Sequence, residues 1–176
     1  MKNNIILTGY MGCGKTTLGK KLSFRERIPF LDTDKMIEAK QKKSIPEIFD
    51  NEGEAAFRQM ETECLREILS DKEHFIISVG GGLPLKEENQ KLLKELGAVI
   101  YLKAEPDTIY GRLKNDTTRP LLRGENPQEK IKEMIKVRGP IYEKAADAIV
   151  CVDEKGYEQI LTEIKNAVKE IEENTK

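Results

Sequence analysis

The chain has 176 residues, a length that predicts one domain over residues 1–176. Its 30 lysines and arginines nearly balance 31 aspartates and glutamates, and the formal charge of −1 argues against a nucleic-acid binder. No apolar run approaches the ~20 residues of a membrane-spanning helix, and the N-terminus lacks a signal-peptide pattern. Cys13, Cys64 and Cys151 are widely spaced and odd in number, which indicates reduced thiols in a cytoplasmic protein.

The first predicted strand, residues 4–8, leads directly into a phosphate-binding motif. Residues 9–16 (GYMGCGKT) match G-x-x-x-x-G-K-[ST] in full, and a helical pattern follows over residues 16–22. Glycines let the backbone curl so that successive N–H groups face phosphates at a helix N-terminus. We expect Lys15 to contact the β- and γ-phosphates and the Thr16 hydroxyl to bind Mg²⁺. The predicted nucleotide-binding set in this loop is Gly12, Cys13, Gly14, Lys15, Thr16 and Thr17.

Cys13 lies inside this loop, near the positive end of the predicted helix. A thiol at a helix N-terminus tends to have a lowered pKa, which would make Cys13 selectively alkylated unless nucleotide protects it. The alternative is a small residue that is tolerated because it fits.

The second predicted strand, residues 29–32, ends in Asp32-Thr33-Asp34. Residues two apart in an extended chain point to the same side, so both carboxylates would face one site at the strand's carboxyl end. One could hold the shell of a metal ion and the other accept a hydrogen bond from an attacking hydroxyl. The alternative is a polar turn in which Asp34 caps the next helix. His74 has no evident partner, so any general base is expected to be a carboxylate.

Ser44 and Glu47 have the spacing of a capping box that opens a short helix. A later helix has apolar residues three and four apart from Phe57 to Leu69, and on it Arg58 shares a face with Glu61, which could hold the guanidinium. The third predicted strand, residues 75–79, ends in three glycines, where many P-loop ATPases and GTPases have an aspartate.

The second half of the chain completes an alternating pattern. Gly97 is a predicted helix stop before a strand at residues 98–102, and the polar segment 115–126, which contains Arg119 and Arg123, is a predicted lid. Asn126 and Pro127 predict an N-cap and the first turn of a helix that ends near Arg138. A strand at residues 148–152 and a helix with apolar residues from 160 to 171 follow. Alternating strands and helices predict an α/β fold with a mostly parallel sheet.

Asp153 offers a competing hypothesis, because the apolar run before it resembles a Walker-B strand and residues 153–156 resemble a GTPase D-x-x-G. This segment is far along the chain from the phosphate-binding loop, and the sequence has no guanine-specific N-K-x-D motif. A GTPase is therefore disfavoured.

Together these motifs resemble the shikimate kinase family over residues 9–146. The resemblance rests on the loop GYMGCGKT, Asp32-Thr33-Asp34, Gly53-Glu54, Phe57-Arg58, Glu61, Gly80-Gly81-Gly82, Arg119-Pro120-Leu121-Leu122, Arg138 and Tyr142. It implies a P-loop, nucleoside-monophosphate-kinase-like, three-layer α/β fold with a five-stranded parallel sheet, a lid at approximately residues 115–126 and a substrate-binding helical segment at approximately 34–61. One departure is that residues 23–28 lack the glycine often seen before the second strand, which predicts a shifted turn.

By that resemblance the reaction is ATP plus shikimate giving ADP and shikimate 3-phosphate, with Mg²⁺, in aromatic amino-acid biosynthesis. The implied catalytic residues are Asp34, Lys15 and Arg119, and Thr16 and Asp32 would hold the metal. The implied shikimate-binding residues are Asp34, Arg58, Gly80, Gly81, Gly82 and Arg138, with the two arginines on the carboxylate. Arg112 would lie against adenine and Arg119 would contact the phosphates. The expected partners are ATP and shikimate, with no nucleic acid or membrane, for a chain expected to be monomeric.

Two alternatives remain at this point. The first is another small-molecule kinase of the same fold, acting on gluconate or a nucleoside monophosphate. The second is a non-catalytic nucleotide switch or chaperone-type ATPase, whose turnover would not depend on a small acid.

Overall fold

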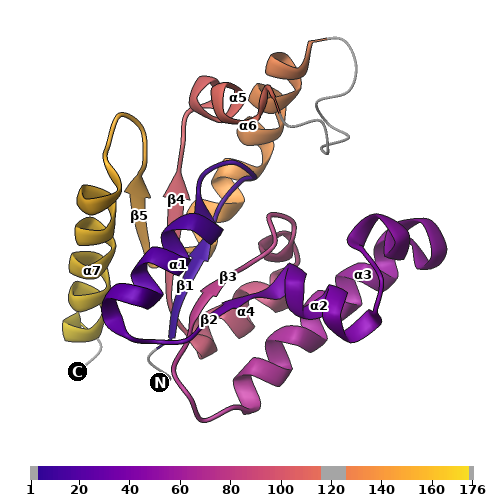
Figure 1. Cartoon of the computed structure of the whole chain (residues 1–176), viewed down its shortest axis with the longest axis horizontal. Coiled ribbons are helices and arrows are strands. Elements are labelled where there is room, and N and C mark those ends of the chain that lie inside the picture. Colours follow the sequence, from indigo (N-terminus) through magenta and orange to yellow (C-terminus); the bar gives the residue numbers. More distant parts are fainter. Residues whose placement is uncertain (1–3, 116–125, 175–176) are drawn as a thin grey trace.

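The structure, a computed structural model, describes residues 4–115 and 126–174. Five strands form one sheet in the order β2-β3-β1-β4-β5, and each neighbouring pair is parallel (Figure 1). The strands are Asn4–Thr8 (β1), Phe30–Asp32 (β2), Ile76–Ser78 (β3), Gly97–Lys103 (β4) and Ala148–Cys151 (β5). All five strand predictions are confirmed, with each end within one residue of its expected place.

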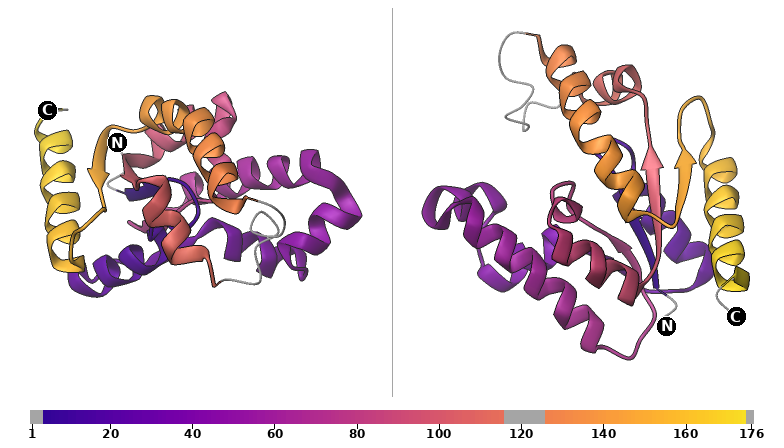
Figure 2. Two further views of the ribbon diagram at one scale, coloured as in Figure 1. Left: turned by 90° about the horizontal axis from the view of Figure 1, so that it is seen from above. Right: turned by 180° about the vertical axis from the view of Figure 1, so that it is seen from behind.

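Helices cover both faces of the sheet, as alternating side chains require. Ile5 and Leu7 of β1 pack in one core and Ile6, which points the other way, packs in a second. Figure 2 shows the two helical layers on opposite sides of the strands, which confirms the three-layer fold. One layer contains Lys15–Glu26 (α1) and Tyr157–Asn174 (α7), and the other contains Glu87–Leu96 (α4) and Pro127–Ala145 (α6). The remaining helical segments are Leu83–Leu85 (η1) and Pro106–Leu113 (α5).

Helices Thr33–Gln41 (α2) and Ile45–Ser70 (α3) form an arm at the β2 side of the molecule (Figure 1). The predicted capping box is present, since the Ser44 hydroxyl accepts the N–H of Glu47 while the Glu47 carboxylate accepts the N–H of Ser44 at 2.7 Å. Gly53 has φ 83° and ψ 169°, so α3 kinks there and its first part is the short helix that was expected. The segment predicted to bind substrate covers most of α2 and the first part of α3.

The predicted helix stop at Gly97 is confirmed, since α4 ends there in extended backbone, and an added Cβ would lie 2.2 Å from the Asn4 carbonyl oxygen. Two other local expectations need correction. Asn126 precedes Pro127 at the start of α6, but its side chain makes no capping hydrogen bond. Arg138 lies inside α6 rather than near its end, because the helix continues through Pro140 to Ala145.

The turn after α1 forms without a glycine. Arg27 takes the left-handed position at the end of the helix, with φ 56° and ψ 37°, and its N–H donates to the Ser23 carbonyl. A residue with a Cβ is strained in this conformation, so the absence of a glycine here raises the free-energy cost of the turn.

Most of the predicted lid, with Arg119 and Arg123, lies outside the described residues. Within residues 4–115 and 126–174, no helix combines the length and apolar character needed to cross a membrane.

Candidate active site

A cavity of about 710 Å³ opens at the carboxyl edge of the sheet. Its walls come from the loop after β1, the start of α2, the glycine turn after β3, helices α3 and α6, and the loop after β5. This is the edge at which open parallel sheets bind ligands. The cavity brings together segments from most of the chain.

The loop between β1 and α1 has the backbone of a phosphate-binding loop. Gly9, Gly12 and Gly14 have φ values of 142°, 79° and 102°, which side chains with a Cβ rarely adopt. The loop ends at the N-terminus of α1, where the first N–H groups of a helix have no partner within the helix and the helix dipole favours an anion. The local sequence therefore builds an anion site from backbone alone.

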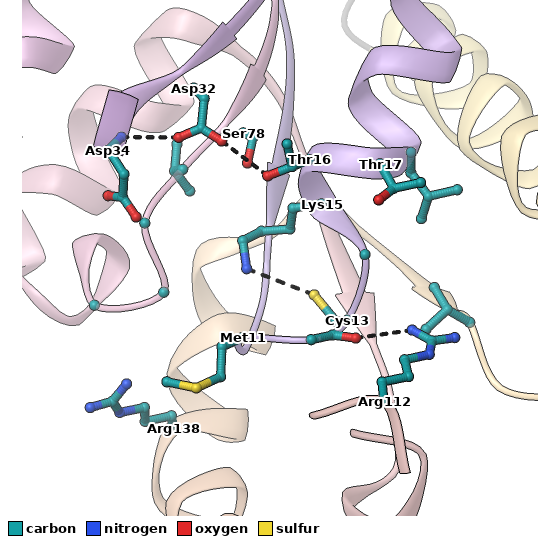
Figure 3. A pocket seen from close by; sticks show the side chains of 18 of the residues that line it. Met11, Cys13, Lys15, Thr16, Thr17, Asp32, Asp34, Ser78, Arg112 and Arg138 are labelled. Atoms are coloured by element: carbon teal, nitrogen blue, oxygen red, sulfur yellow. Dashed lines mark hydrogen bonds between the residues drawn. The ribbon is translucent and has the colours of Figure 1, made fainter. Parts of the chain in front are cut away.

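Lys15 folds back over this loop. Its ammonium donates to the carbonyl oxygens of Gly9 at 2.8 Å and Tyr10 at 3.1 Å, and it lies 3.8 Å from the Cys13 sulfur (Figure 3). Cys13 is 1% exposed, and an added Cβ on Gly9 would lie 2.9 Å from its sulfur. This burial favours the small residue that fits the loop over a thiol open to alkylation.

Asp32 connects the phosphate-binding loop to α2. Its carboxylate accepts the Thr16 hydroxyl at 3.0 Å and the backbone N–H groups of Asp34 and Lys35 at 3.1 and 3.3 Å (Figure 3). Two expectations are therefore wrong, since the chain is helical rather than extended at Asp34 and it is Asp32 that caps the helix. Both carboxylates still line the cavity, because one ends a strand and the other lies in the first turn of the helix.

Asp34 lies against the glycine turn, where an added Cβ on Gly80 would be 2.5 Å from its Oδ1. Arg58 approaches the same turn from α3, because an added Cβ on Gly82 would lie 2.2 Å from its Nη1. Side chains at these two positions would thus displace a carboxylate and a guanidinium that face the cavity. The glycines predicted to bind substrate lie beside both predicted substrate-binding side chains.

Arg58 is oriented by two carboxylates of its own helix. It donates to Glu61 at 2.8 Å and to Glu54 at 3.0 and 3.3 Å. The partnership with Glu61 follows from their spacing of three residues. Glu61 is 1% exposed, and burial raises its pKa to about 7, although the ion pair with Arg58 lowers it. Its Oε1 has no hydrogen-bond partner among the described residues.

The predicted carboxylate-binding arginine of α6, Arg138, also lines the cavity. Its guanidinium carbon lies 6.0 Å from the centre of the Tyr10 ring, and Figure 3 shows the side chain beside Met11.

The cavity also has an apolar wall that the sequence analysis did not predict. It is formed near Arg58 by Ile45, Phe49 and Phe57. The signal in the sequence was the presence of these apolar residues on the helical arm, where the Phe49 and Phe57 rings pack at a tilt with centroids 4.8 Å apart.

The other end of the cavity contains Arg112, which donates to the Gly12 carbonyl at 3.1 Å. Residues 155–157 after β5 line this end, together with Val152. Asp153 does not, because its carboxylate accepts the N–H of Glu105 at 3.0 and 3.2 Å. The Walker-B hypothesis for Asp153 is therefore wrong, and its role is structural.

A magnesium ion would fit the Thr16–Asp32 pair. Magnesium usually takes one or two protein oxygens and completes its shell with phosphate oxygens and water. Within the described ranges no three histidine, cysteine, aspartate or glutamate side chains cluster to hold a metal. A hydroxyl and a carboxylate 3.0 Å apart beside the phosphate-binding loop are the kind of partial ligand set that needs bound phosphates to complete it.

A phosphate-binding loop shares one cavity with an aspartate and two arginines at the carboxyl edge of a five-stranded parallel sheet, which is the arrangement of a P-loop kinase of the nucleoside-monophosphate-kinase type. The family model described as "Shikimate kinase" matches residues 11–169. The chain belongs to the shikimate kinase family.

Two relatives show how close this match is. A shikimate kinase of Dictyoglomus turgidum is 44% identical over 167 residues, which cover 93% of this chain and 96% of that protein. The structure of a shikimate kinase from Acinetobacter baumannii in complex with shikimate has a TM-score of 0.87 and 35% identity, covering 97% of this chain and 94% of the other. A gluconokinase from Sinorhizobium meliloti, 13% identical with a TM-score of 0.60 and covering 98% of this chain and 95% of the other, shares the fold alone.

Proposed function

We propose that this protein transfers the γ-phosphoryl group of ATP to the 3-hydroxyl of shikimate, forming shikimate 3-phosphate and ADP in the biosynthesis of chorismate and the aromatic amino acids. The observation that supports it most is a single cavity lined by Lys15, Asp34 and Arg58. A kinase for a small hydroxylated acid needs a phosphate-binding cation, a base and a carboxylate-binding cation within reach of one another.

On the donor side, the backbone of residues 12–17 binds the phosphates, with Arg112 against the adenine. Lys15 exchanges the carbonyls of Gly9 and Tyr10 for oxygens of the β- and γ-phosphates. Thr16 and Asp32 would hold Mg²⁺, which when bound supplies positive charge to the phosphate oxygens. The existing hydrogen bond between these two side chains keeps both near the loop.

On the acceptor side, Arg58 and Arg138 bind the carboxylate, because a guanidinium donates in a planar fork that matches it. The glycine turn lets backbone N–H groups approach the ring hydroxyls. Asp34 accepts the proton of the attacking hydroxyl as its oxygen bonds to the γ-phosphorus and the bond to the ADP oxygen breaks. Arg119, outside the described residues, would neutralise charge on the transferring group and close with the lid to exclude water.

The same proposal extends to the state of the protein. Three free thiols and a formal charge of −1 support a cytoplasmic enzyme with small-molecule partners and no nucleic acid. We expect a monomer, which light scattering during size-exclusion chromatography would check. A stable dimer mass would contradict this part alone.

A coupled assay of ADP release tests the proposed reaction. Purified protein with MgATP should turn over shikimate, and should turn over gluconate and nucleoside monophosphates at least ~10²-fold more slowly. Gluconate has a carboxylate but no ring to hold the reacting hydroxyl at a fixed distance from it, and a nucleotide brings a base that the acceptor site would have to accommodate. No turnover of shikimate, with turnover of gluconate or a nucleotide, would favour the related small-molecule kinases. ATP hydrolysis that no small acid accelerates would favour the nucleotide switch.

A further inference from the structure

The glycine turn after β3 is held by side chains from three different helices. At its start the N–H of Gly80 donates to the Thr33 hydroxyl of α2 at 3.1 Å. Just beyond its end the Leu83 carbonyl accepts the Asn89 amide of α4 at 2.9 Å. In its middle the Tyr142 hydroxyl of α6 donates to the Gly81 carbonyl at 2.6 Å. The two ends are therefore anchored independently of Tyr142.

The middle bond determines the direction of one N–H group. The Gly81 carbonyl and the Gly82 N–H belong to one planar trans peptide, so they point in opposite directions. Tyr142 is 1% exposed and lies outside the cavity lining, whereas Gly81 and Gly82 are part of that lining. With its carbonyl bound on the buried side, the peptide directs its N–H toward the cavity. No described residue accepts a hydrogen bond from this N–H.

Little else resists rotation of this peptide. Reversing it changes the backbone angles of Gly81 and Gly82, and neither residue has a Cβ that would clash with the moving carbonyl. The buried hydroxyl thus selects one of two sterically accessible orientations. In the reversed orientation the carbonyl would face the cavity, where it could accept a hydrogen bond but could not donate one.

Tyr142 is well suited to act as a fixed donor. Its ring packs against that of Tyr101 with centroids 5.3 Å apart. Burial raises its pKa to about 12, while the positive charge of the nearby Arg138 lowers it. The proton therefore stays on the oxygen at neutral pH. The hydroxyl that contacts the glycine turn thus lies near the arginine assigned to the acceptor's carboxylate.

We propose that Tyr142 is a positioning residue of the acceptor site, whose hydroxyl holds the Gly81–Gly82 peptide so that the Gly82 N–H donates to an oxygen of the acceptor. This inference deepens the proposed function and rests on it. It assigns Tyr142 no contact with the substrate.

The variant Tyr142→Phe removes only the hydroxyl, and Tyr101→Phe is a matched control, since the ring belongs to the same pair and its hydroxyl has no hydrogen bond to the glycine turn. Tyr142→Phe should raise the KM for shikimate about 5- to 10-fold, the effect of losing one well-placed hydrogen bond, while the KM for ATP changes less than about twofold. Tyr101→Phe should leave both KM values within about twofold. An unchanged KM for shikimate in Tyr142→Phe, or an equal rise of both KM values, would overturn the inference.

A second measurement uses the unmodified protein and remains decisive if the variant does not fold. In ¹H–¹⁵N spectra the amide proton of Gly82 should move downfield when shikimate is added, as expected for a new hydrogen bond. A Gly82 signal that stays in place at saturating shikimate would overturn the inference while leaving the proposed function intact. Absence of shikimate turnover by the wild-type protein would overturn both.

Discussion

Glu61 is a buried carboxylate close to one cation, Arg58, and two other carboxylates, Asp34 and Glu54. Burial raises its pKa from 4.5 to about 7, Arg58 lowers it, and the charge of Asp34 raises it. A carboxyl with a raised folded-state pKa binds more protons in the folded than in the unfolded protein between pH 4.5 and 7. Its stabilising contribution is therefore fully present below about pH 4.5 and is lost as the pH rises through about 7.

We predict that Glu61→Gln flattens the pH dependence of stability. Between pH 4.5 and 7.5 the wild-type free energy of unfolding should lose up to about 3 kcal/mol through this group, a loss that the uncharged amide cannot show. Urea titrations at intervals across this range would measure it, with Glu63→Gln as the exposed control on the same helix. Parallel curves for the wild type and Glu61→Gln would show that the group does not titrate as inferred.

Asp34 is the residue on which the chemical step depends in the proposed function. Asp34→Asn should lower kcat by about 10²-fold or more with little change in ATP binding, because an amide cannot accept the proton of the attacking hydroxyl. Steady-state kinetics and nucleotide titration would separate the two effects. Asp71→Asn, in the loop between α3 and β3 at the opposite edge of the sheet, is the control. Near-normal kcat for Asp34→Asn would reduce its role to structure.

The glycines of the turn after β3 lead to a further prediction, which depends on the space around them rather than on their backbone angles. An alanine methyl at position 82 would lie 2.2 Å from Arg58 Nη1, so Gly82→Ala should displace the guanidinium. The expected result is a rise of about 10-fold or more in the KM for shikimate, with the KM for ATP nearly constant. Gly111→Ala, which has no atom within 4 Å of the added methyl, is the control. A defect confined to ATP would contradict the assignment of Arg58.

At the scale of elements, helix α1 ends in a strained backbone conformation that a glycine would adopt without strain. Its final turn has Arg27 in the left-handed region at φ 56°, a position where glycine has no steric cost. Arg27→Gly should therefore raise the free energy of unfolding by about 0.5 kcal/mol, since relief of roughly 1 kcal/mol of strain is partly offset by the flexibility of glycine in the unfolded chain. Thermal unfolding would measure the gain. Arg27→Ala removes the same side chain without relieving the strain, so an equal gain there would refute the explanation.

The α2–α3 arm carries one group of the residues that line the cavity, and other elements carry the rest. Asp34 comes from the start of α2, and Arg58 and Glu61 come from α3 beyond the kink at Gly53. The phosphate-binding loop and α1 belong to the other side of the cavity. The groups proposed to bind acceptor and donor thus come from different elements, so variants on the arm are expected to change the KM for shikimate more than the KM for ATP.

For the molecule as a whole, we predict that a metal ion is needed for the reaction and not for the stability of the fold. Within the described residues no three-group metal cluster ties elements together, and the Thr16–Asp32 pair needs phosphate oxygens to complete a magnesium shell. Excess EDTA should therefore abolish turnover, by ~10²-fold or more, and leave the apparent Tm within about 1 °C. Differential scanning fluorimetry with and without EDTA would check this. A fall of several degrees would indicate a structural metal.

The spacing of residues along the chain was enough to predict much of the structure of this protein. The five strands, the phosphate-binding loop, the capping box at Ser44 and the Arg58–Glu61 pair follow from patterns within a few residues, because their hydrogen bonds and apolar faces form between near neighbours. The family resemblance added the predicted roles of these residues. It could not say that Asp32, rather than Asp34, would cap α2, which depends on where the strand ends and the helix begins.

Tertiary structure alone decided the contacts that shape the cavity. Tyr142 and Gly81 are 61 positions apart, and no periodicity in either segment links a hydroxyl on one to a carbonyl on the other. The same holds for Asp153 and Glu105. The sequence made Asp153 a plausible Walker-B residue, but its carboxylate accepts the Glu105 N–H and its role is structural. Such bonds form because the packing of helices against a twisted sheet sets which buried polar groups meet, and a buried polar group must find a partner wherever the chain brings one.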